Sequence, residues 1–132
     1  MLTTTDDGSY GRKGLVTEPL REMLASGMEV ARVIAIGPTV MMKFCAKTTQ
    51  PFGVKTIVSL NPIMVDGTGM CGCCRVSVGG ATRFACIDGP DFDAHEVDWD
   101  ELMARQRTYT DSESKALLNW QDHQCGPTRE AH

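Results

Sequence analysis

The chain has 132 residues, which is enough for one domain or for a small domain with an appendage. Its hydrophobic share of 42% and charged share of 23% are those of ordinary globular proteins, and its net charge of −4 argues against nucleic acid as a partner. The sequence contains no apolar run of roughly 18 residues and no signal peptide, so we expect a cytoplasmic protein with no membrane partner.

The first part of the chain predicts strands that alternate with helices. Short β-like runs occur at 2–5, 30–36 and 54–60. The second run is almost continuously apolar, as in a strand that is buried on both faces. Two helices are expected between the runs, with Thr17 and Thr39 as their capping residues. This β-α-β-α-β order implies a parallel sheet with right-handed crossovers.

Such a sheet is only half of a dinucleotide-binding domain. No Gly-x-Gly-x-x-Gly follows an opening strand, so the first phosphate-binding turn is missing. Two turns nonetheless follow predicted parallel strands, where ligands bind in sheets of this type. They are formed by Asp6, Asp7 and Gly8 and by Gly37 and Pro38. Carboxylates in the first turn can hold ribose hydroxyls, and a solvent-exposed turn is the alternative.

A glycine-rich loop that contains three cysteines follows the third run. Counted from Asp66, the spacing reads Asp-x4-Cys-x2-Cys-x11-Cys, and its thiols belong to Cys71, Cys74 and Cys86. Plant-type [2Fe–2S] proteins use Cys-x4-Cys-x2-Cys and a distant fourth Cys, so Asp66 stands where the first thiolate would be. A carboxylate can replace a thiolate at some cost in softness. The spacing therefore predicts a [2Fe–2S] cluster held by these four residues.

Alternatives to this ligand set stay open. Asp66 can instead accept hydrogen bonds from loop N–H groups, and Cys73 is either a replacement ligand or an oxidation-prone bystander. The spacing favours Asp66. Zinc also uses Cys-x2-Cys but usually needs a second Cys or His pair, which His95 alone does not supply. Of the other cysteines, we expect Cys45 in the core and Cys125 without a role.

The rest of the chain predicts a hairpin followed by helices. The segments at 75–78 and 82–84 flank Gly79-Gly80, a pair that favours a two-residue hairpin turn. Asp98-Trp-Asp-Glu reads as a capping box that opens an acidic helix. The expected helices cover 98–107 and 112–120, and a frayed end covers 121–132.

Two stretches of this region carry a family resemblance. They are SLNPIMVDGTGMCGCCRVSVGG (59–80) and FACIDGPDFDAHEVDWDELMARQ (84–106). They resemble the C-terminal part of electron-transfer subunits of the ferredoxin reductase superfamily, a group that includes sulfide dehydrogenase, the small subunit of NADH-dependent ferredoxin:NADP oxidoreductase and the dihydroorotate dehydrogenase electron-transfer subunit. The likeness extends from about residue 4 to about residue 113. The Asp-plus-three-Cys form looks more like the first two branches, since the dihydroorotate-linked branch normally uses four cysteines.

The resemblance implies an α/β fold in three parts. These are the C-terminal half of a parallel-sheet, ferredoxin reductase-like NAD(P)-binding domain at 1–60, a small [2Fe–2S] cluster-binding domain with a β-hairpin at 61–97, and an acidic helical tail at 98–132. It also implies that the turns at 6–8 and 37–38 face the nucleotide. In the family, a flavin-binding barrel and the first half of the nicotinamide domain come earlier. NAD(P) and FAD are therefore expected in the complete subunit and not on this chain alone, which would start midway through a larger architecture.

On these grounds we expect an iron–sulfur electron-transfer subunit or fragment that relays electrons between a flavin/NAD(P)H site and the clusters of a larger oxidoreductase partner. The expected partner is a larger iron–sulfur flavoprotein subunit, with ferredoxin as a further candidate. The chain alone is not expected to oxidise NAD(P)H. Two alternatives are kept: a structural zinc-binding interaction module, and an inactive remnant of a truncated reductase subunit.

Overall fold

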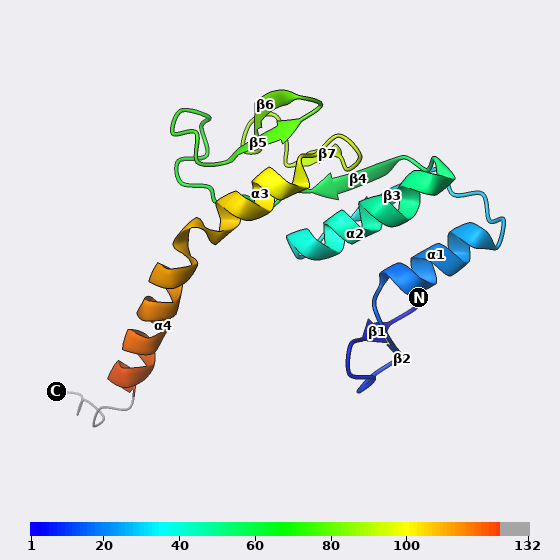
Figure 1. Cartoon of the computed structure of the whole chain (residues 1–132), viewed down its shortest axis with the longest axis horizontal. Helices are drawn as coiled ribbons and strands as arrows, with labels where there is room; N and C mark the ends of the chain where they lie inside the picture. The colour runs from blue at the N-terminus through cyan, green and yellow to red at the C-terminus, as the bar shows by residue number, and fades with distance from the viewer. Residues whose placement is uncertain (125–132) are drawn as a thin grey trace.

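The computed structural model describes residues 1–124, which form a mixed α/β arrangement of small sheets and helices (Figure 1). The strands are β1 (Thr4–Thr5), β2 (Arg12–Lys13), β3 (Val33–Ala35), β4 (Thr56–Ser59), β5 (Arg75–Val78), β6 (Ala81–Phe84) and β7 (Asp91–Asp93). The α-helices are α1 (Thr17–Ala25), α2 (Thr39–Thr49), α3 (Trp99–Gln106) and α4 (Thr110–Gln124). Short 3-10 turns follow α2 at Gln50–Phe52 and α3 at Arg107–Tyr109.

The central sheet has three strands in the order β3-β4-β7. β3 pairs with β4 in parallel, and β7 pairs with the other side of β4 in the antiparallel direction, so that Val58 lies opposite Phe92. β7 lies in the segment that was predicted to form the cluster-binding domain, and it completes the sheet begun by residues 1–60. The sheet is therefore mixed, and the fully parallel sheet that was predicted is not formed by these residues.

The prediction that the first strand joins this sheet is wrong. β1 instead pairs in parallel with β2, in a separate two-stranded sheet. The chain turns back within a few residues, and the backbone N–H groups of Arg12 and Gly14 donate to the carbonyls of Thr3 and Thr5 at 2.9 and 3.1 Å. Pairing with such a near neighbour closes only a short loop, so its cost in chain entropy is small.

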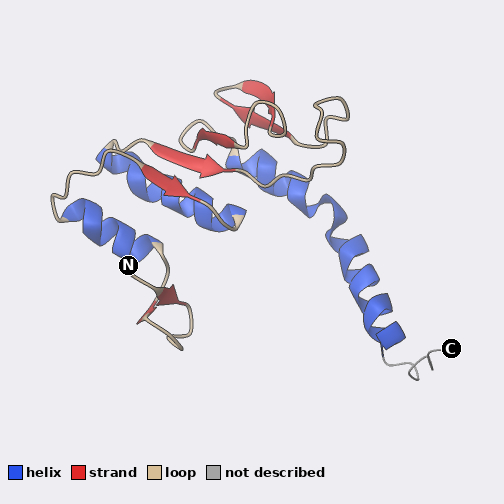
Figure 2. Ribbon diagram, turned by 180° about the vertical axis from the view of Figure 1, so that it is seen from behind, coloured by secondary structure: helices blue, strands red, loops and turns tan. Residues whose placement is uncertain are grey.

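β3 is an edge strand, and the prediction that it is buried on both faces is wrong. Ile34 in this strand is 65% exposed and Ile36, just after it, is 71% exposed, whereas Ala35 between them is buried. Thr56 and Val58 of β4 are also buried, and the alternate residues Ile57 and Ser59 are only partly so. This alternation is typical of a sheet with one covered face, and α2 is the helix that covers it (Figure 2).

One continuous core joins α2 to the central sheet, the β5–β6 hairpin and α3. Met42 of α2, Val58 of β4, Val76 of β5 and Leu102 of α3 are among its most deeply buried side chains. Cys45 also belongs to this core, as predicted, with 4% of its surface exposed. Burial raises the pKa of its thiol. The segment that carries the cysteine loop is thus packed directly against the N-terminal half.

Of the three predicted helix-capping residues, one caps its helix in the structure. Asp98 caps α3 as predicted, because its carboxylate accepts the N–H groups of Asp100 and Glu101 at 3.1 and 2.9 Å. Thr17 and Thr39 do not cap their helices, whose N-cap residues are the preceding Val16 and Pro38. The Thr39 hydroxyl is instead hydrogen-bonded across the molecule, and such a partner competes with the local cap.

The last helix is longer than predicted and points away from the rest of the molecule (Figure 1). Leu117, Leu118 and Trp120 on it are all more than half exposed. The rest of the tail that was predicted to be frayed, including Cys125, lies outside the described residues. No helix in the described part of the chain has the length and apolar character needed to cross a bilayer.

Candidate metal centre

The β5–β6 hairpin brings two cysteines together that are distant in sequence. Cys74 immediately precedes β5, and Cys86 follows β6 with one residue, Ala85, between them. Gly79 and Gly80 both have positive φ, as the predicted two-residue turn requires. The resulting register continues beyond the strands, where the N–H of Ala85 donates to the carbonyl of Cys74 at 3.1 Å. The Sγ atoms of Cys74 and Cys86 then lie 3.2 Å apart.

The second pair of candidate donors lies in the loop before the hairpin. One carboxylate oxygen of Asp66 accepts the backbone N–H of Thr68, and the other accepts that of Cys71, both at 2.9 Å. The hydrogen bond from the Thr68 N–H makes the largest contribution to lowering the pKa of Asp66. Asp66 therefore has the loop-stabilising role that was kept as an alternative. Its oxygens retain further lone pairs, so this role is compatible with metal ligation.

Contacts at Gly69 join this loop to Cys86. A hydrogen bond with the backbone of Gly69 favours the thiolate of Cys86, although the hydrogen bond with Cys74 has the larger effect and raises the pKa of Cys86 overall. The Ile87 side chain covers the loop, and its Cδ1 atom lies 2.6 Å from the place where a Cβ at Gly69 would be. A Cβ there would push the end of the exposed Ile87 side chain aside, and the φ of +82° at this position favours glycine.

The thiols of the loop differ in how readily they ionise. The pKa of Cys71 is lowered, chiefly because the backbone N–H of Cys73 points at its Sγ atom at 3.5 Å. The pKa of Cys73 is raised, with its hydrogen bond to Cys71 as the main cause. Metals bind the thiolate form, so the local hydrogen bonds favour Cys71 over Cys73 as a ligand.

The candidate donors are arranged as two pairs. Among residues 1–124, no three His, Cys, Asp or Glu side chains converge as a site for one ion would require. A [2Fe–2S] cluster instead takes two protein ligands at each iron. Cys74 with Cys86, and Asp66 with Cys71, provide two such pairs, and Gly69 connects them. Thiolates and, less often, carboxylates are the donor types that such a group uses.

The structure does not bring the two predicted nucleotide-facing turns together. In the turn at 6–8, Asp7 accepts the N–H of Ser9 at 2.9 Å, and this bond is the main cause of its lowered pKa. The turn at 37–38 leads into α2, and the Met41 side chain lies over Gly37. Within the described region no hydrogen bond links the two turns, and Figures 1 and 2 show the β1–β2 turn well away from the start of α2.

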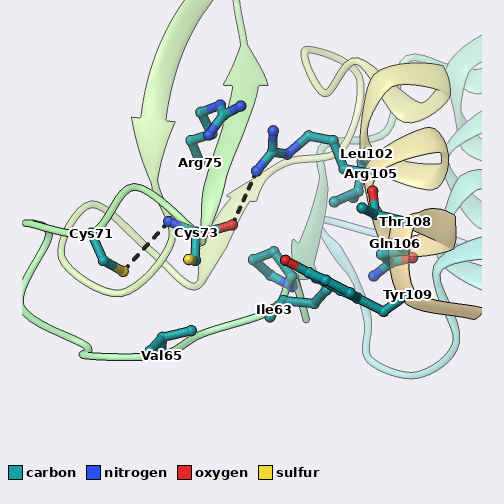
Figure 3. Close-up of a pocket in the computed structure, with 11 residues that line it drawn as sticks. Ile63, Val65, Cys71, Cys73, Arg75, Leu102, Arg105, Gln106, Thr108 and Tyr109 are labelled. Carbon is teal, nitrogen blue, oxygen red and sulfur yellow. Dashed lines mark hydrogen bonds between the residues drawn. The ribbon is translucent and has the colours of Figure 1, made fainter. Parts of the chain in front are cut away.

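Sequence reasoning missed a cavity that borders the cysteine loop. Its volume is about 460 Å³, and Figure 3 shows the side chains around it. The loop contributes Cys71 and Cys73, and the end of α3 and the following turn contribute Arg105, Gln106 and Tyr109. Arg105 lies 32 residues from Cys73. No local pattern relates residues so far apart, so the sequence offered no signal for this contact.

Comparisons with known proteins agree with this geometry. Residues 61–98 match the family model of the iron–sulfur cluster binding domain of dihydroorotate dehydrogenase B. An uncharacterised protein in the adh 3′ region of Clostridium beijerinckii is 54% identical over 119 residues, which are 89% of this chain and 40% of that protein. A Thermotoga maritima homologue of the dihydroorotate dehydrogenase B (NAD(+)) electron transfer subunit is 53% identical over 113 residues, which are 86% of this chain and 40% of that protein.

A solved structure shows the same likeness. It is that of an NADH-dependent reduced ferredoxin-NADP oxidoreductase, described in relation to flavin-based electron bifurcation. One of its chains matches with a TM-score of 0.80 and 50% identity, over 90% of this chain and 42% of that one. The chain thus spans about 40% of the length of the curated relatives named above. The family resemblance predicted from the sequence is confirmed.

Proposed function

We propose, from the likeness to electron-transfer subunits of the dihydroorotate dehydrogenase B type, that this chain holds a [2Fe–2S] cluster and relays electrons between a flavin/NAD(P)H site and the clusters of a larger oxidoreductase partner. One observation carries the proposal. The Cys74 and Cys86 thiols meet at 3.2 Å beside the Asp66–Cys71 loop, inside the segment that matches an iron–sulfur binding domain. Such a group, when bound, supplies one-electron transfer.

In this proposal the four ligands have distinct surroundings. Cys74 is buried at the base of the hairpin, and the β5–β6 register keeps Cys86 next to it. Cys71 and Asp66 belong to the more exposed loop, where backbone N–H groups stabilise their negative charge. Hydrogen bonds and solvent exposure are among the factors that set the potential of such a group. The buried pair would anchor it, and the exposed pair would face the solvent or a partner.

The N-terminal half would contribute to nucleotide binding only in the complete subunit. In this proposal residues 1–60 are part of the NAD(P)-binding domain, 61–97 form the cluster-binding domain and 98–132 form the helical tail. The turn at 37–38 leads directly to Thr39, whose hydroxyl lies 2.8 Å from Gln106 Oε1 and 3.1 Å from Asn61 Oδ1. These bonds would connect a nucleotide-facing turn of the complete subunit to the segment that precedes the cluster loop.

The partners follow from the same reasoning. We place NAD(P) and FAD in the complete subunit, with Asp6, Asp7, Gly8, Gly37 and Pro38 on the nucleotide side. The protein partner would be a larger iron–sulfur flavoprotein subunit, and ferredoxin is a second candidate. The one-electron steps of a cluster allow it to connect the two-electron chemistry of a flavin with one-electron carriers.

Metal analysis of the anaerobically purified chain tests the proposal. We expect about two irons and about two acid-labile sulfides per chain, with red-brown colour and an EPR signal after reduction. The Cys86→Ala variant should lose them, and Cys125→Ala, a cysteine outside the matched segment, should keep them. Stoichiometric zinc in a colourless protein would support the zinc-module alternative. A protein that binds neither metal would support the truncated remnant.

A further inference from the structure

Two arginines from different elements hold the loop between Cys71 and Cys74. Arg75, at the start of β5, donates from Nη1 to the carbonyl of Gly72 at 3.2 Å. Arg105, in the last turn of α3, donates from Nη2 to the carbonyl of Cys73 at 3.2 Å. Figure 3 shows the Arg105 side chain reaching across to the loop and Arg75 standing on the neighbouring strand. The two carbonyls belong to the only two residues that separate the candidate ligands Cys71 and Cys74.

The hydrogen bonds that both guanidinium groups form among residues 1–124 are to backbone carbonyls. Within the described part of the chain, neither Arg75 nor Arg105 forms an ion pair with a carboxylate, whereas Arg12 and Lys43 do. Both arginines line the cavity of about 460 Å³ that Cys71 and Cys73 also border. Arg105 is partly buried, so its charge is less screened by solvent than that of the exposed Arg75.

Charge near an iron–sulfur group changes the free energy of its reduction. Four anionic ligands make a [2Fe–2S] group anionic when it is oxidised, and reduction adds one more negative charge. A nearby cation stabilises the more negative state, and the effect is largest where the solvent is partly excluded. Two guanidinium groups that contact the ligand-bearing loop therefore favour the reduced state.

We propose that Arg105, assisted by Arg75, is a positioning residue that fixes the Cys71–Cys74 loop and raises the reduction potential of the group held there. This inference rests on the proposed function, because it presupposes a [2Fe–2S] cluster at the loop. The hydrogen bonds to Gly72 and Cys73 account for the positioning, and the positive charges of the two arginines account for the potential. Arg105 has the larger effect because it is the less exposed of the two.

An EPR-monitored redox titration of the cluster-loaded protein tests the inference. Arg105→Gln removes the charge but keeps an amide donor, and Arg105→Lys keeps the charge. Arg21→Gln on the exposed surface of α1 is the matched control for loss of one positive charge far from the loop. We expect Arg105→Gln to lower the equilibrium constant for reduction on the order of tenfold, or about 59 mV for a one-electron couple. Arg75→Gln should shift it less, and this shift should shrink as the salt concentration rises.

The outcomes separate the two proposals. A potential of Arg105→Gln equal to that of Arg21→Gln would overturn the inference and leave the proposed function intact. If Arg105→Lys lowered the reduction potential as much as Arg105→Gln, charge would not be the cause. That result would also overturn the inference. Absence of any [2Fe–2S] signal in the unaltered chain would overturn both proposals. If circular dichroism shows that Arg105→Gln does not fold, Arg75→Gln is the test. A fall in its reduction potential that shrinks with rising salt would support the inference, and no fall would overturn it.

Discussion

The Sγ atoms of Cys74 and Cys86 lie 3.2 Å apart, although the two residues are separated by 12 positions in the sequence. The antiparallel register of β5 and β6 is the cause, because it places Ala85, the residue next to Cys86, opposite Cys74. That register depends on a two-residue turn in which both residues have positive φ. The geometry of the turn therefore controls the geometry of the candidate ligands.

Substitution of Gly80 tests this dependence. A Cβ at Gly80 would meet no atom within 4 Å, so Gly80→Val acts through backbone strain at φ +74° and not through a clash. We expect a loss of about 1–2 kcal/mol in the free energy of unfolding, because a β-branched residue is strained at positive φ. Gly80→Asn is the control, since asparagine tolerates this conformation. Urea denaturation measures both, and equal stability of the two variants would contradict the expectation.

The fourth ligand can be identified by substitution at Asp66 and Cys73. Asp66→Cys should keep the cluster and shift its potential, because a thiolate replaces the carboxylate. Asp66→Asn should preserve much of the loop, since its side-chain oxygen can still accept the Thr68 N–H, but should weaken cluster binding. Cys73→Gly should be nearly neutral. Iron content and visible spectra measure the outcome, and loss of the cluster in Cys73→Gly but not in Asp66→Ala would identify Cys73 as the ligand.

A buried hydroxyl network joins the two halves of the chain. The hydroxyl of Thr49 lies 2.6 Å from that of Thr56 and 3.0 Å from His95 Nε2. Thr49→Val should lower the free energy of unfolding by about 1–2 kcal/mol, because the buried Thr56 hydroxyl then keeps only the Val54 carbonyl and the exposed His95 loses a hydrogen bond. Thr48→Val is the matched control, since its hydroxyl bonds only the Phe44 carbonyl of its own helix. For Thr48→Val we expect a loss of less than about 1 kcal/mol in the free energy of unfolding. Urea titration measures both variants, and similar losses in the two would contradict the role of the network.

The buried thiol of Cys45 should be slow to react. Burial raises its pKa, so in the folded protein Cys45 stays protonated over a pH range in which an exposed cysteine ionises. The unfolded chain releases this proton at lower pH, so the contribution of Cys45 to the free energy of unfolding should fall as the pH rises. We expect iodoacetamide at about pH 8.5 to modify Cys45 much faster in urea than in buffer. Mass spectrometry of the labelled peptides measures this, and equal rates would mean that the thiol is accessible in the folded protein.

Local structure was predictable where neighbouring residues decide it. The Gly79-Gly80 hairpin turn and the Asp98 cap of α3 depend on residues only a few positions apart, and both are confirmed. The failures arose where partners are distant. Thr39 was predicted to cap its helix but bonds Asn61 and Gln106, and the strand at 30–36 was predicted to be buried on both faces but forms a sheet edge.

The sequence by itself predicted an iron–sulfur binding segment, because the spacing of Asp66, Cys71, Cys74 and Cys86 depends only on residue identity and order. Only the tertiary structure decided which of these donors meet, that β7 completes the sheet of the N-terminal half, and that the Arg105 side chain reaches the loop. The physical reason is that these contacts join residues far apart in the chain. They depend on how α2, the central sheet, the hairpin and α3 bury one common core, which no local pattern specifies.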